Sequence, residues 1–237
     1  MEMYGEEWAA RFDEMAQAGI PGREGLFRIA DACLSDLPSD ARILVVGCGT
    51  GAEVLHLAGR HPGWRFEAVE PAAAMMAACR RRVEAAGLSG RVALHERPLA
   101  GLRVGPCHGA TAVLVSQHLP DDGAAGEFFA DIAANLAAGG VLYSADISAP
   151  AAGSERAVLL DLWRRQAVSA GIPGDALDGM LGRFGRDIAV RPAERVASLV
   201  TGAGFAVPVR VFQSLIYSAW VCQRHAEPGA APDRRGT

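Results

Sequence analysis

The sequence lacks the paired cysteines that structural metal sites and redox sites use. Its five cysteines are odd in number and scattered over 237 residues, and no two of them form a Cys-x-x-Cys pair. No grouping of His, Asp and Glu repeats at the spacing of metal ligands either. We therefore expect no metal site, and free thiols that suit the reducing cytosol predict a cytoplasmic protein.

Long apolar runs and an excess of charge are also missing. The first residues, MEMYGEEWAARFDEM, contain acids and no apolar core, and no run of about eighteen uncharged apolar residues occurs, so we expect neither a signal peptide nor a membrane span. The formal net charge of -4 gives no attraction for phosphate backbones, and the arginines at positions 80–82 are typical of a solvated helix face. We expect a small-molecule partner rather than nucleic acid or a membrane.

Half of the residues are hydrophobic, which is enough for a substantial core. From residue 41 onward short apolar runs alternate with alanine-rich stretches, the pattern of strands and crossover helices in a parallel sheet. We predict a three-layer, doubly wound α/β fold with a mostly parallel seven-stranded sheet whose C-terminal strand is antiparallel. The expected strands cover residues 42–47, 65–70, 91–96, 110–116, 141–146, 205–212 and 215–223.

The expected helices separate into three groups. Core helices are predicted over residues 51–60, 72–86 and 123–137, the last ended by Gly139 and Gly140, and a closing helix over 193–201. Two amphipathic helices over residues 6–18 and 24–35 are expected to cap the C-terminal edge of the sheet. A helical insertion with a glycine-rich part follows the fifth strand and is interpreted as a lid.

The segment ILVVGCGTGAE, residues 43–53, runs from an apolar strand through three glycines into a helix. Gly47 permits a sharp reversal, and Gly49 lets a ligand lie against bare backbone. The helix that follows directs its unpaired N–H groups at the same place. About twenty residues further on, the second strand ends at Glu70, from which a carboxylate reaches the ribose of a nucleoside. Gly47, Gly49 and Ala52 also satisfy the dinucleotide pattern Gly-x-Gly-x-x-Ala, so this motif alone leaves both kinds of nucleotide site open.

Four segments in order carry a resemblance to one family: VVGCGTGAE, EAVEPAAAMMAACRRR, VLVSQHLPDD and LAAGGVLYSADI. Over residues 41–224 the chain resembles the class I, Rossmann-like S-adenosylmethionine-dependent methyltransferases that act on small molecules. The ending AGFAVPVRVFQSLIYSAWV is similar to the closing hairpin of carboxy-S-adenosylmethionine synthase-like members. The resemblance implies S-adenosyl-L-methionine as cofactor and methyl transfer to an O or N atom of a small acceptor.

By this resemblance the glycines wrap the methionine moiety and Glu70 holds the ribose. The sequence departs from the family at Val45, where an acid often stands, and at Pro98, near the usual position of an acid that caps adenine. The implied cofactor-binding residues are Gly47, Cys48, Gly49, Gly51, Glu70, Pro71, Met75, Arg97, Pro98, Leu99 and Ser116.

Methyl transfer requires a nucleophile aligned with the S–CH3 bond and, for an alcohol or ammonium, a base. His118 follows the fourth strand, at the sheet edge where ligands bind in open α/β folds, and Asp146 ends the fifth. We take these two residues as the candidate catalytic groups, although such a histidine also shapes a pocket without titrating and such an acid also caps a loop. The candidate acceptor-binding residues are Tyr4, Trp8, Arg183 and Arg186.

These predictions divide the chain into a single domain over residues 1–226 and a disordered tail over 227–237. Within the domain we expect a helical cap (1–40), a cofactor-binding core (41–148), a helical insertion (149–190), and a closing helix with a hairpin (191–226). The apolar hairpin is also compatible with a homodimer. Three alternatives stay open: a carboxy-S-adenosylmethionine synthase-like enzyme, a nicotinamide-dependent oxidoreductase, and a non-catalytic nucleoside-binding protein.

Overall fold

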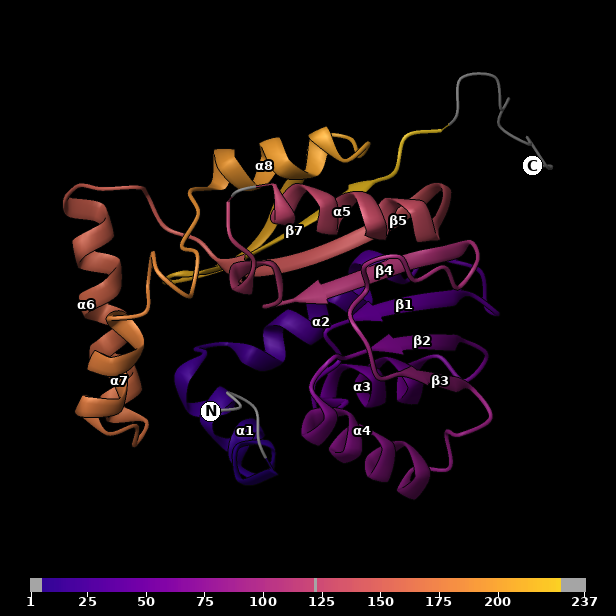
Figure 1. Ribbon diagram of the computed structural model, residues 1–237, viewed down its shortest axis with the longest axis horizontal. Helices are drawn as coiled ribbons and strands as arrows, with labels where there is room; N and C mark the ends of the chain where they lie inside the picture. Colours follow the sequence, from indigo (N-terminus) through magenta and orange to yellow (C-terminus); the bar gives the residue numbers. More distant parts are fainter. Residues whose placement is uncertain (1–5, 122, 227–237) are drawn as a thin grey trace.

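The computed structural model of the chain describes residues 6–121 and 123–226 and contains a seven-stranded sheet of order β3-β2-β1-β4-β5-β7-β6 (Figure 1). The first five strands pair in parallel, and β7 runs antiparallel to both β5 and β6. The predicted doubly wound, mostly parallel sheet with an antiparallel C-terminal strand is confirmed. The strands are β1 (Arg42–Val46), β2 (Arg65–Val69), β3 (Val92–His95), β4 (Cys107–Val113), β5 (Leu136–Ile147), β6 (Val209–Ser214) and β7 (Tyr217–Gln223).

Eight α-helices and one short 3-10 helix occur in the described part of the chain. The helices are α1 (Glu6–Gly19), α2 (Arg23–Leu34), α3 (Ala52–Arg60), α4 (Ala73–Ala85), α5 (Ala124–Asn135), α6 (Ser154–Ser169), α7 (Gly174–Leu181) and α8 (Ala193–Gly202), with the 3-10 helix η1 over Ser116–His118. None of these helices is long and apolar enough to cross a membrane.

The strand β1 shows why helices cover both faces of the sheet. Successive side chains of a strand point to opposite faces, and all four apolar residues of β1 are buried. Ile43 and Val45 pack in the cluster that contains α3 and α4 side chains, whereas Leu44 and Val46 pack in the cluster that contains those of α5 and α8. Burial on both faces fixes β1 in the centre of the molecule and places the loop that follows it at the edge of the sheet.

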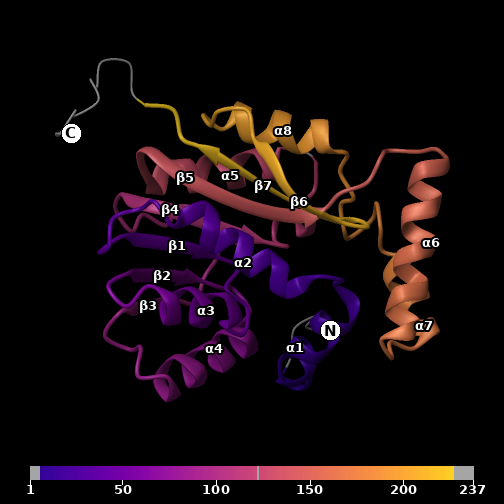
Figure 2. The same ribbon diagram turned by 180° about the vertical axis from the view of Figure 1, so that it is seen from behind.

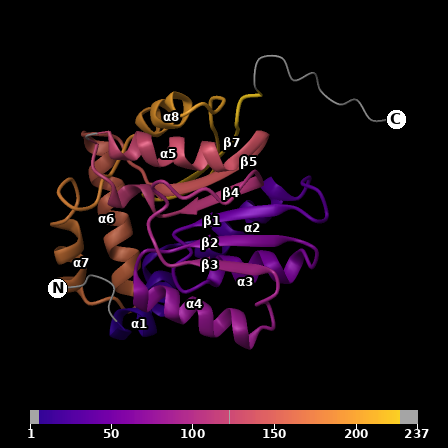
Figure 3. The same ribbon diagram turned by 45° about the vertical axis from the view of Figure 1, so that its right-hand side comes forward.

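The N-terminal helices and the insertion meet at that edge. Figure 1 and Figure 3 show α1, α6 and α7 beyond the ends of the strands, on the same side of the sheet. The indole Nε1 of Trp163 donates to the carbonyl of Gly19 at 2.9 Å, and Gln166 Nε2 donates to that of Ala18 at 3.2 Å. The second helix, α2, instead lies along the sheet and packs Leu26 and Ala30 against β5 and β7 (Figure 2). The cap at the edge is therefore supplied by α1, the insertion and the first part of α2.

The end of α5 differs from the sequence-based prediction. The helix ends at Asn135, and Gly139 and Gly140 lie inside β5, where Gly139 N donates to Arg224 O at 3.1 Å. The fully buried Asn135 explains the early end: its Nδ2 donates to the carbonyl of Leu102 and its Oδ1 accepts from the N–H of Val104. The interpretation of the two glycines as the helix stop was wrong. The expected tail, residues 227–237, lies outside the described residues.

Candidate functional site

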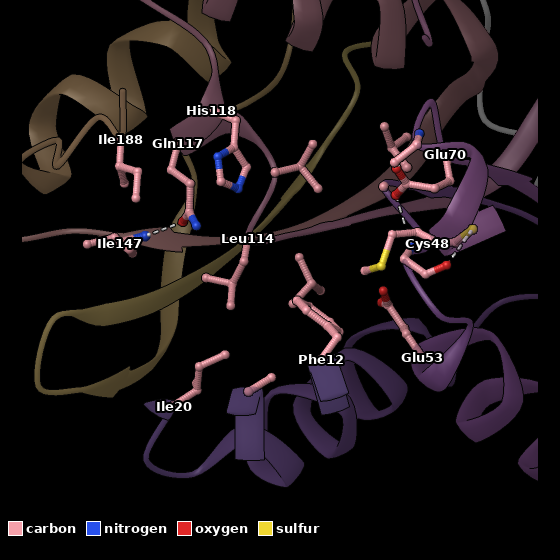
Figure 4. A pocket seen from close by; sticks show the side chains of 18 of the residues that line it. Phe12, Ile20, Cys48, Glu53, Glu70, Leu114, Gln117, His118, Ile147 and Ile188 are labelled. Carbon is pink, nitrogen blue, oxygen red and sulfur yellow. Dashed lines mark hydrogen bonds between the residues drawn. The ribbon is translucent and has the colours of Figure 1, made fainter. Parts of the chain in front are cut away.

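A cavity of about 910 Å³ lies at the carboxyl ends of β1, β2, β4 and β5, under α1, α2 and the insertion (Figure 4). Its volume is near the upper end of the range for small-molecule sites, so it has room for two small ligands side by side. The glycine loop and Glu70 line one end. Apolar side chains of the insertion line the other end, among them Trp163, Leu177 and Ile188.

The loop after β1 has its shape because two of its residues are glycine. Gly47 has a φ of 66°, and a Cβ there would lie 2.4 Å from Cγ2 of Val115. Gly51 has a φ of 86°, and a Cβ there would lie 2.8 Å from Sγ of Cys79. Both positions exclude any other side chain. The loop therefore lies close against η1 and α4 and leaves its Gly49 backbone facing the cavity.

Glu70 joins the end of β2 to this loop. Its Oε2 accepts a hydrogen bond from Gly49 N at 3.1 Å, and its Oε1 accepts one from Ala72 N at 2.9 Å. Burial raises the pKa of the Glu70 carboxyl, and the two backbone N–H groups oppose that shift. An ionised carboxylate has about four acceptor positions, so two remain for a ligand.

Eight of the eleven expected cofactor residues line the cavity: Gly47, Cys48, Gly49, Glu70, Pro71, Met75, Pro98 and Leu99. Gly51, Arg97 and Ser116 are not among the lining residues. Gly51 instead permits close packing of α4, Arg97 is exposed, and Ser116 is buried against Asp146.

His118 faces the cavity from the end of η1 (Figure 4). Its side chain has a surface open to the cavity, and protein atoms surround the rest of it. Desolvation by these atoms lowers the pKa of the imidazole, and the charge of Arg183 lowers it further. Beside it the amide of Gln117 also lines the cavity, and Gln117 Oε1 accepts from Ile147 N at 3.1 Å. His118 is therefore neutral at pH 7 and can accept a proton there.

Asp146 lies behind η1, not in the cavity lining. Its Oδ1 accepts from Ser116 Oγ at 2.9 Å and from Gln117 N at 3.1 Å, while the residue is only 2% exposed. Burial raises the pKa of this carboxyl to about 7. The contacts of Asp146 fix the loop that carries His118.

Arg191, which the sequence analysis did not single out, holds the same loop from the other side. This buried guanidinium donates to the carbonyls of Ser116 and Leu119 and forms an ion pair of 2.8 Å with Asp121. Asp121 lies seventy positions earlier in the chain. Nothing in the local pattern around Arg191 indicates this partner, because the contact depends on how the insertion folds back.

The expected acceptor-binding residues have different positions. Arg183 lines the cavity and pairs with Asp187 at 3.5 Å, whereas Arg186 is exposed, does not line the cavity and pairs with the same Asp187 at 3.0 Å. Tyr4 and the side chain of Trp8 lie outside the described residues. Apolar lining residues that the sequence analysis did not assign include Phe12, Met15, Ile20, Leu114, Ile147 and Met180.

Trp163 and Tyr217 are aromatic residues of the cavity wall. Both are at most 3% exposed, and both line the cavity.

Glu53 is a further residue that the sequence analysis left without a role. It lies in the first turn of α3, directly after the glycine loop, and its side chain points into the cavity beside Phe12 (Figure 4). It is 5% exposed, and Oε1 has no hydrogen-bond partner among residues 6–121 and 123–226. Desolvation raises the pKa of this carboxyl to about 7. An acid directly after a glycine loop was the signal available in the sequence.

The residues that the structure describes contain no group of three or more His, Cys, Asp or Glu side chains placed to hold a metal ion.

Comparison with known proteins gives a family for the central part of this fold. Residues 43–140 match the family model described as a methyltransferase domain. No curated protein matches the sequence. The matched segment begins in β1 and ends within β5, so it contains the glycine loop, Glu70 and His118.

Solved structures share the fold at low identity. An O-methyltransferase family protein from Burkholderia thailandensis is 18% identical, with a TM-score of 0.61, 85% of this chain covered and 56% of the other. The 1,6-didemethyltoxoflavin-N1-methyltransferase of that organism, solved with its substrate and S-adenosylhomocysteine, is 18% identical, with a TM-score of 0.60 and 88% and 79% covered. The cyclase SpnF is 15% identical, with a TM-score of 0.63 and 84% and 82% covered.

The chain spans 56% of the length of the Burkholderia O-methyltransferase family protein, so that protein contains parts that this chain does not match. The predicted resemblance in fold is confirmed, while the likeness of the closing hairpin to carboxy-S-adenosylmethionine synthases stays a prediction. Residues 43–140 thus match a methyltransferase domain, and the chain shares its fold with solved methyltransferases.

Proposed function

We propose that this protein transfers the methyl group of S-adenosylmethionine to an O or N atom of a small-molecule acceptor by in-line displacement. The observation that carries the proposal is the continuous cavity, which joins the Gly49 backbone and Glu70 at one end to His118 and the apolar chamber at the other. A nucleoside cofactor and an acceptor can meet only if both sites open into one space.

The nucleoside end fits an adenosine. Glu70 is already held by Gly49 and Ala72, so its two remaining acceptor positions are oriented for the two ribose hydroxyls without further ordering. Pro71 and Leu99 line the neighbouring part of the cavity and give apolar surface for a flat base. The Gly49 backbone leaves room for the amino-acid tail next to the loop.

The acceptor end supplies alignment, exclusion of water and a proton acceptor. When bound, S-adenosylmethionine supplies a methyl group already activated by the positive sulfonium, so no covalent catalyst is needed. The neutral imidazole of His118 can take the proton of an acceptor hydroxyl or ammonium. Leu114, Ile147 and Ile188 exclude water around it. Asp146 acts through Ser116 and the Gln117 backbone as a positioning residue.

A titration tests the cofactor assignment. We expect the protein to bind S-adenosylhomocysteine and not NADH in a calorimeter. Glu70→Ala should weaken that binding by about one to a few kcal/mol because charge-assisted hydrogen bonds are lost. Glu84→Ala, at an exposed position of α4, removes the same charge and should change nothing. Tight binding of NADH alone, or equal affinity in the Glu70 variant, would contradict the proposal.

A carboxy-S-adenosylmethionine synthase-like reaction is a second candidate because Arg183 lines the cavity close to His118, where a cation could hold an additional carboxylate. Mass spectrometry of cofactor that copurifies with the protein separates the two reactions. A carboxylated species would favour the second candidate, and unmodified S-adenosylmethionine or S-adenosylhomocysteine the first.

A further inference from the structure

Glu53 is a buried carboxyl that the proposed reaction leaves unused. It contributes to the cavity wall and is 5% exposed, yet Oε1 has no hydrogen-bond partner within the described segments of the chain. An isolated ionised carboxylate in an apolar surrounding costs several kcal/mol, and the protein responds by raising its pKa, here to about 7. A carboxyl whose pKa lies near 7 loses its proton readily when a cation is placed next to it.

The other charged and titratable groups around Glu53 do not supply that cation. Cys48 and Tyr143 are the titratable groups on which its charge acts, and both can only become negative. Thr111 of β4 is close enough for its hydroxyl to oppose the rise in the pKa of Glu53, but Oγ1 of Thr111 has no hydrogen-bond partner of good geometry in the described chain. The hydroxyl of Tyr143 donates to the carbonyl of Leu26. Arg23 lines the same cavity but is paired with Asp13 at 2.8 Å. No ion pair of Glu53 occurs among the described residues, so a cationic ligand in the cavity could supply one.

The position of Glu53 indicates which part of the ligand would contact its carboxylate. Figure 4 shows Cys48 between Glu70, at the end of β2, and Glu53, in the first turn of α3. Gly49, the next residue after Cys48, donates to Glu70. A nucleoside whose ribose lies at Glu70 extends its amino-acid tail past Gly49 toward Glu53. That tail contains two cationic groups, an α-ammonium and a sulfonium, and only the ammonium has N–H groups that can donate to the Glu53 carboxylate.

We propose that the Glu53 carboxylate binds the α-ammonium group of the amino-acid tail of the cofactor. At the end of β1 the chain has Val45, so the carboxylate beside the glycine loop on this side of the cavity is that of Glu53. The inference rests on the proposed function, since it takes S-adenosylmethionine as the ligand. It makes Glu53 a binding residue and leaves the methyl-transfer step unchanged.

The test compares three ligands that differ in their cations. S-adenosylmethionine has the ammonium and the sulfonium, S-adenosylhomocysteine has the ammonium alone, and 5′-methylthioadenosine has neither. We expect Glu53→Gln to weaken the first two equally, by roughly tenfold to a hundredfold, as for a lost hydrogen bond between charged groups. Binding of 5′-methylthioadenosine should change less than about twofold. Glu70→Ala should weaken all three, and Glu84→Gln, which removes a charge on the outer surface, none.

The outcomes separate the inference from the function on which it rests. Unchanged affinity of Glu53→Gln for S-adenosylhomocysteine, a loss for S-adenosylmethionine alone, or an equal loss for 5′-methylthioadenosine would each overturn the role of Glu53 while the cofactor assignment stands. If the wild-type protein binds none of the three ligands, the proposed function fails and the inference fails with it.

A second measurement needs no variant, in case Glu53→Gln does not fold. The wild-type protein should bind the analogue of S-adenosylhomocysteine that lacks the α-amino group at least about tenfold more weakly than S-adenosylhomocysteine itself. Equal affinity for the two would overturn the proposal.

Discussion

At the scale of single residues, the loop after β1 shows how the absence of a side chain at one position shapes a ligand site. Gly47 combines a positive φ with the closest approach of a neighbouring side chain in this loop. We predict that Gly47→Ala lowers the free energy of unfolding by about 2 to 4 kcal/mol, because backbone strain and overlap with Val115 add. Chemical denaturation measures the change.

Val115→Ala provides the matched control for this substitution. In the double variant with Gly47→Ala, it removes Cγ2 of Val115, the atom 2.4 Å from the added Cβ. The double variant should therefore regain the part of the unfolding free energy lost to steric overlap, but not the part lost to backbone strain. Strictly additive losses would show that the two residues do not press on one another.

His118 is the residue whose chemistry matters most at the acceptor end. Its pKa is lowered by burial and by Arg183, so the wild-type rate should stay high down to a pH below the ordinary histidine pKa and then fall as the imidazole is protonated. His118→Gln should reduce the rate and remove this acid limb from the pH profile at saturating cofactor. A profile of unchanged shape in the variant would make His118 a wall residue.

At the scale of elements, the segment from Ser116 to Asp121 is held by groups from two distant parts of the chain. Arg191 donates to two of its carbonyls, and Asp146 accepts from its N-terminal end. We predict that Arg191→Ala lowers the free energy of unfolding by about 2 to 4 kcal/mol, because buried carbonyls lose their donor. Urea denaturation checks this value.

Arg195→Ala is the control, because Arg195 pairs with the same Asp121 at 3.2 Å but is half exposed. A surface pair of this kind contributes less than about 1 kcal/mol. If the two variants lose the same stability, the buried contacts of Arg191 do not stabilise the loop as described.

The sequence predicted the elements of the core well because their signals are local. The glycines and the apolar run before them specify the first strand, its loop and α3 within one or two residues. The end of α5 was misplaced because its cause, the hydrogen bonds of Asn135 to residues 102 and 104, is tertiary. For the same reason the contribution of Arg191 and the difference between Arg183 and Arg186 depend on how the insertion returns to the sheet.

At the scale of the whole molecule, two buried carboxyls couple stability to pH. Burial raises the pKa of Glu53 and of Asp146 to about 7, from ordinary values of 4.5 and 3.8. Between those values the folded protein holds protons that the unfolded chain has released, so this stabilisation is complete at low pH and is lost as the pH rises through 7. Asp31 and Asp121, whose pKa values are lowered, act in the opposite sense at acid pH. His56 and His118, whose pKa values are also lowered, oppose the trend as the pH rises through the ordinary histidine pKa.

We therefore predict that the free energy of unfolding of the ligand-free protein falls between pH 5.5 and pH 8, by roughly 1 to 3 kcal/mol. The double variant Glu53→Gln, Asp146→Asn should show a flatter dependence and exceed the wild type at pH 8. Denaturation curves at the two pH values measure this. Parallel curves for wild type and variant would mean that neither carboxyl changes its protonation in this range.

The architecture as a whole explains why the nucleoside end was predictable and the acceptor end was not. Residues 43–70 form two neighbouring parallel strands joined by the glycine loop and α3, so the glycines and Glu70 meet through local geometry. The acceptor chamber is assembled from α1, α2, α6, α7 and β7, which are far apart in sequence (Figure 1). Its residues are mainly apolar, and apolar residues at helical spacing predict burial without indicating what they surround.

The central claim is that the loop after β1 and Glu70 hold the adenosyl group of the cofactor, and that the sulfur attached to this group faces His118 across the cavity. The most direct measurement is a crystal structure of the protein with S-adenosylhomocysteine. We predict ribose hydroxyls within hydrogen-bond distance of Glu70, the amino-acid tail along Gly49, and the sulfur open to the chamber lined by Leu114 and Ile188. A nucleoside bound elsewhere, or a cavity filled by side chains of the insertion, would contradict the account.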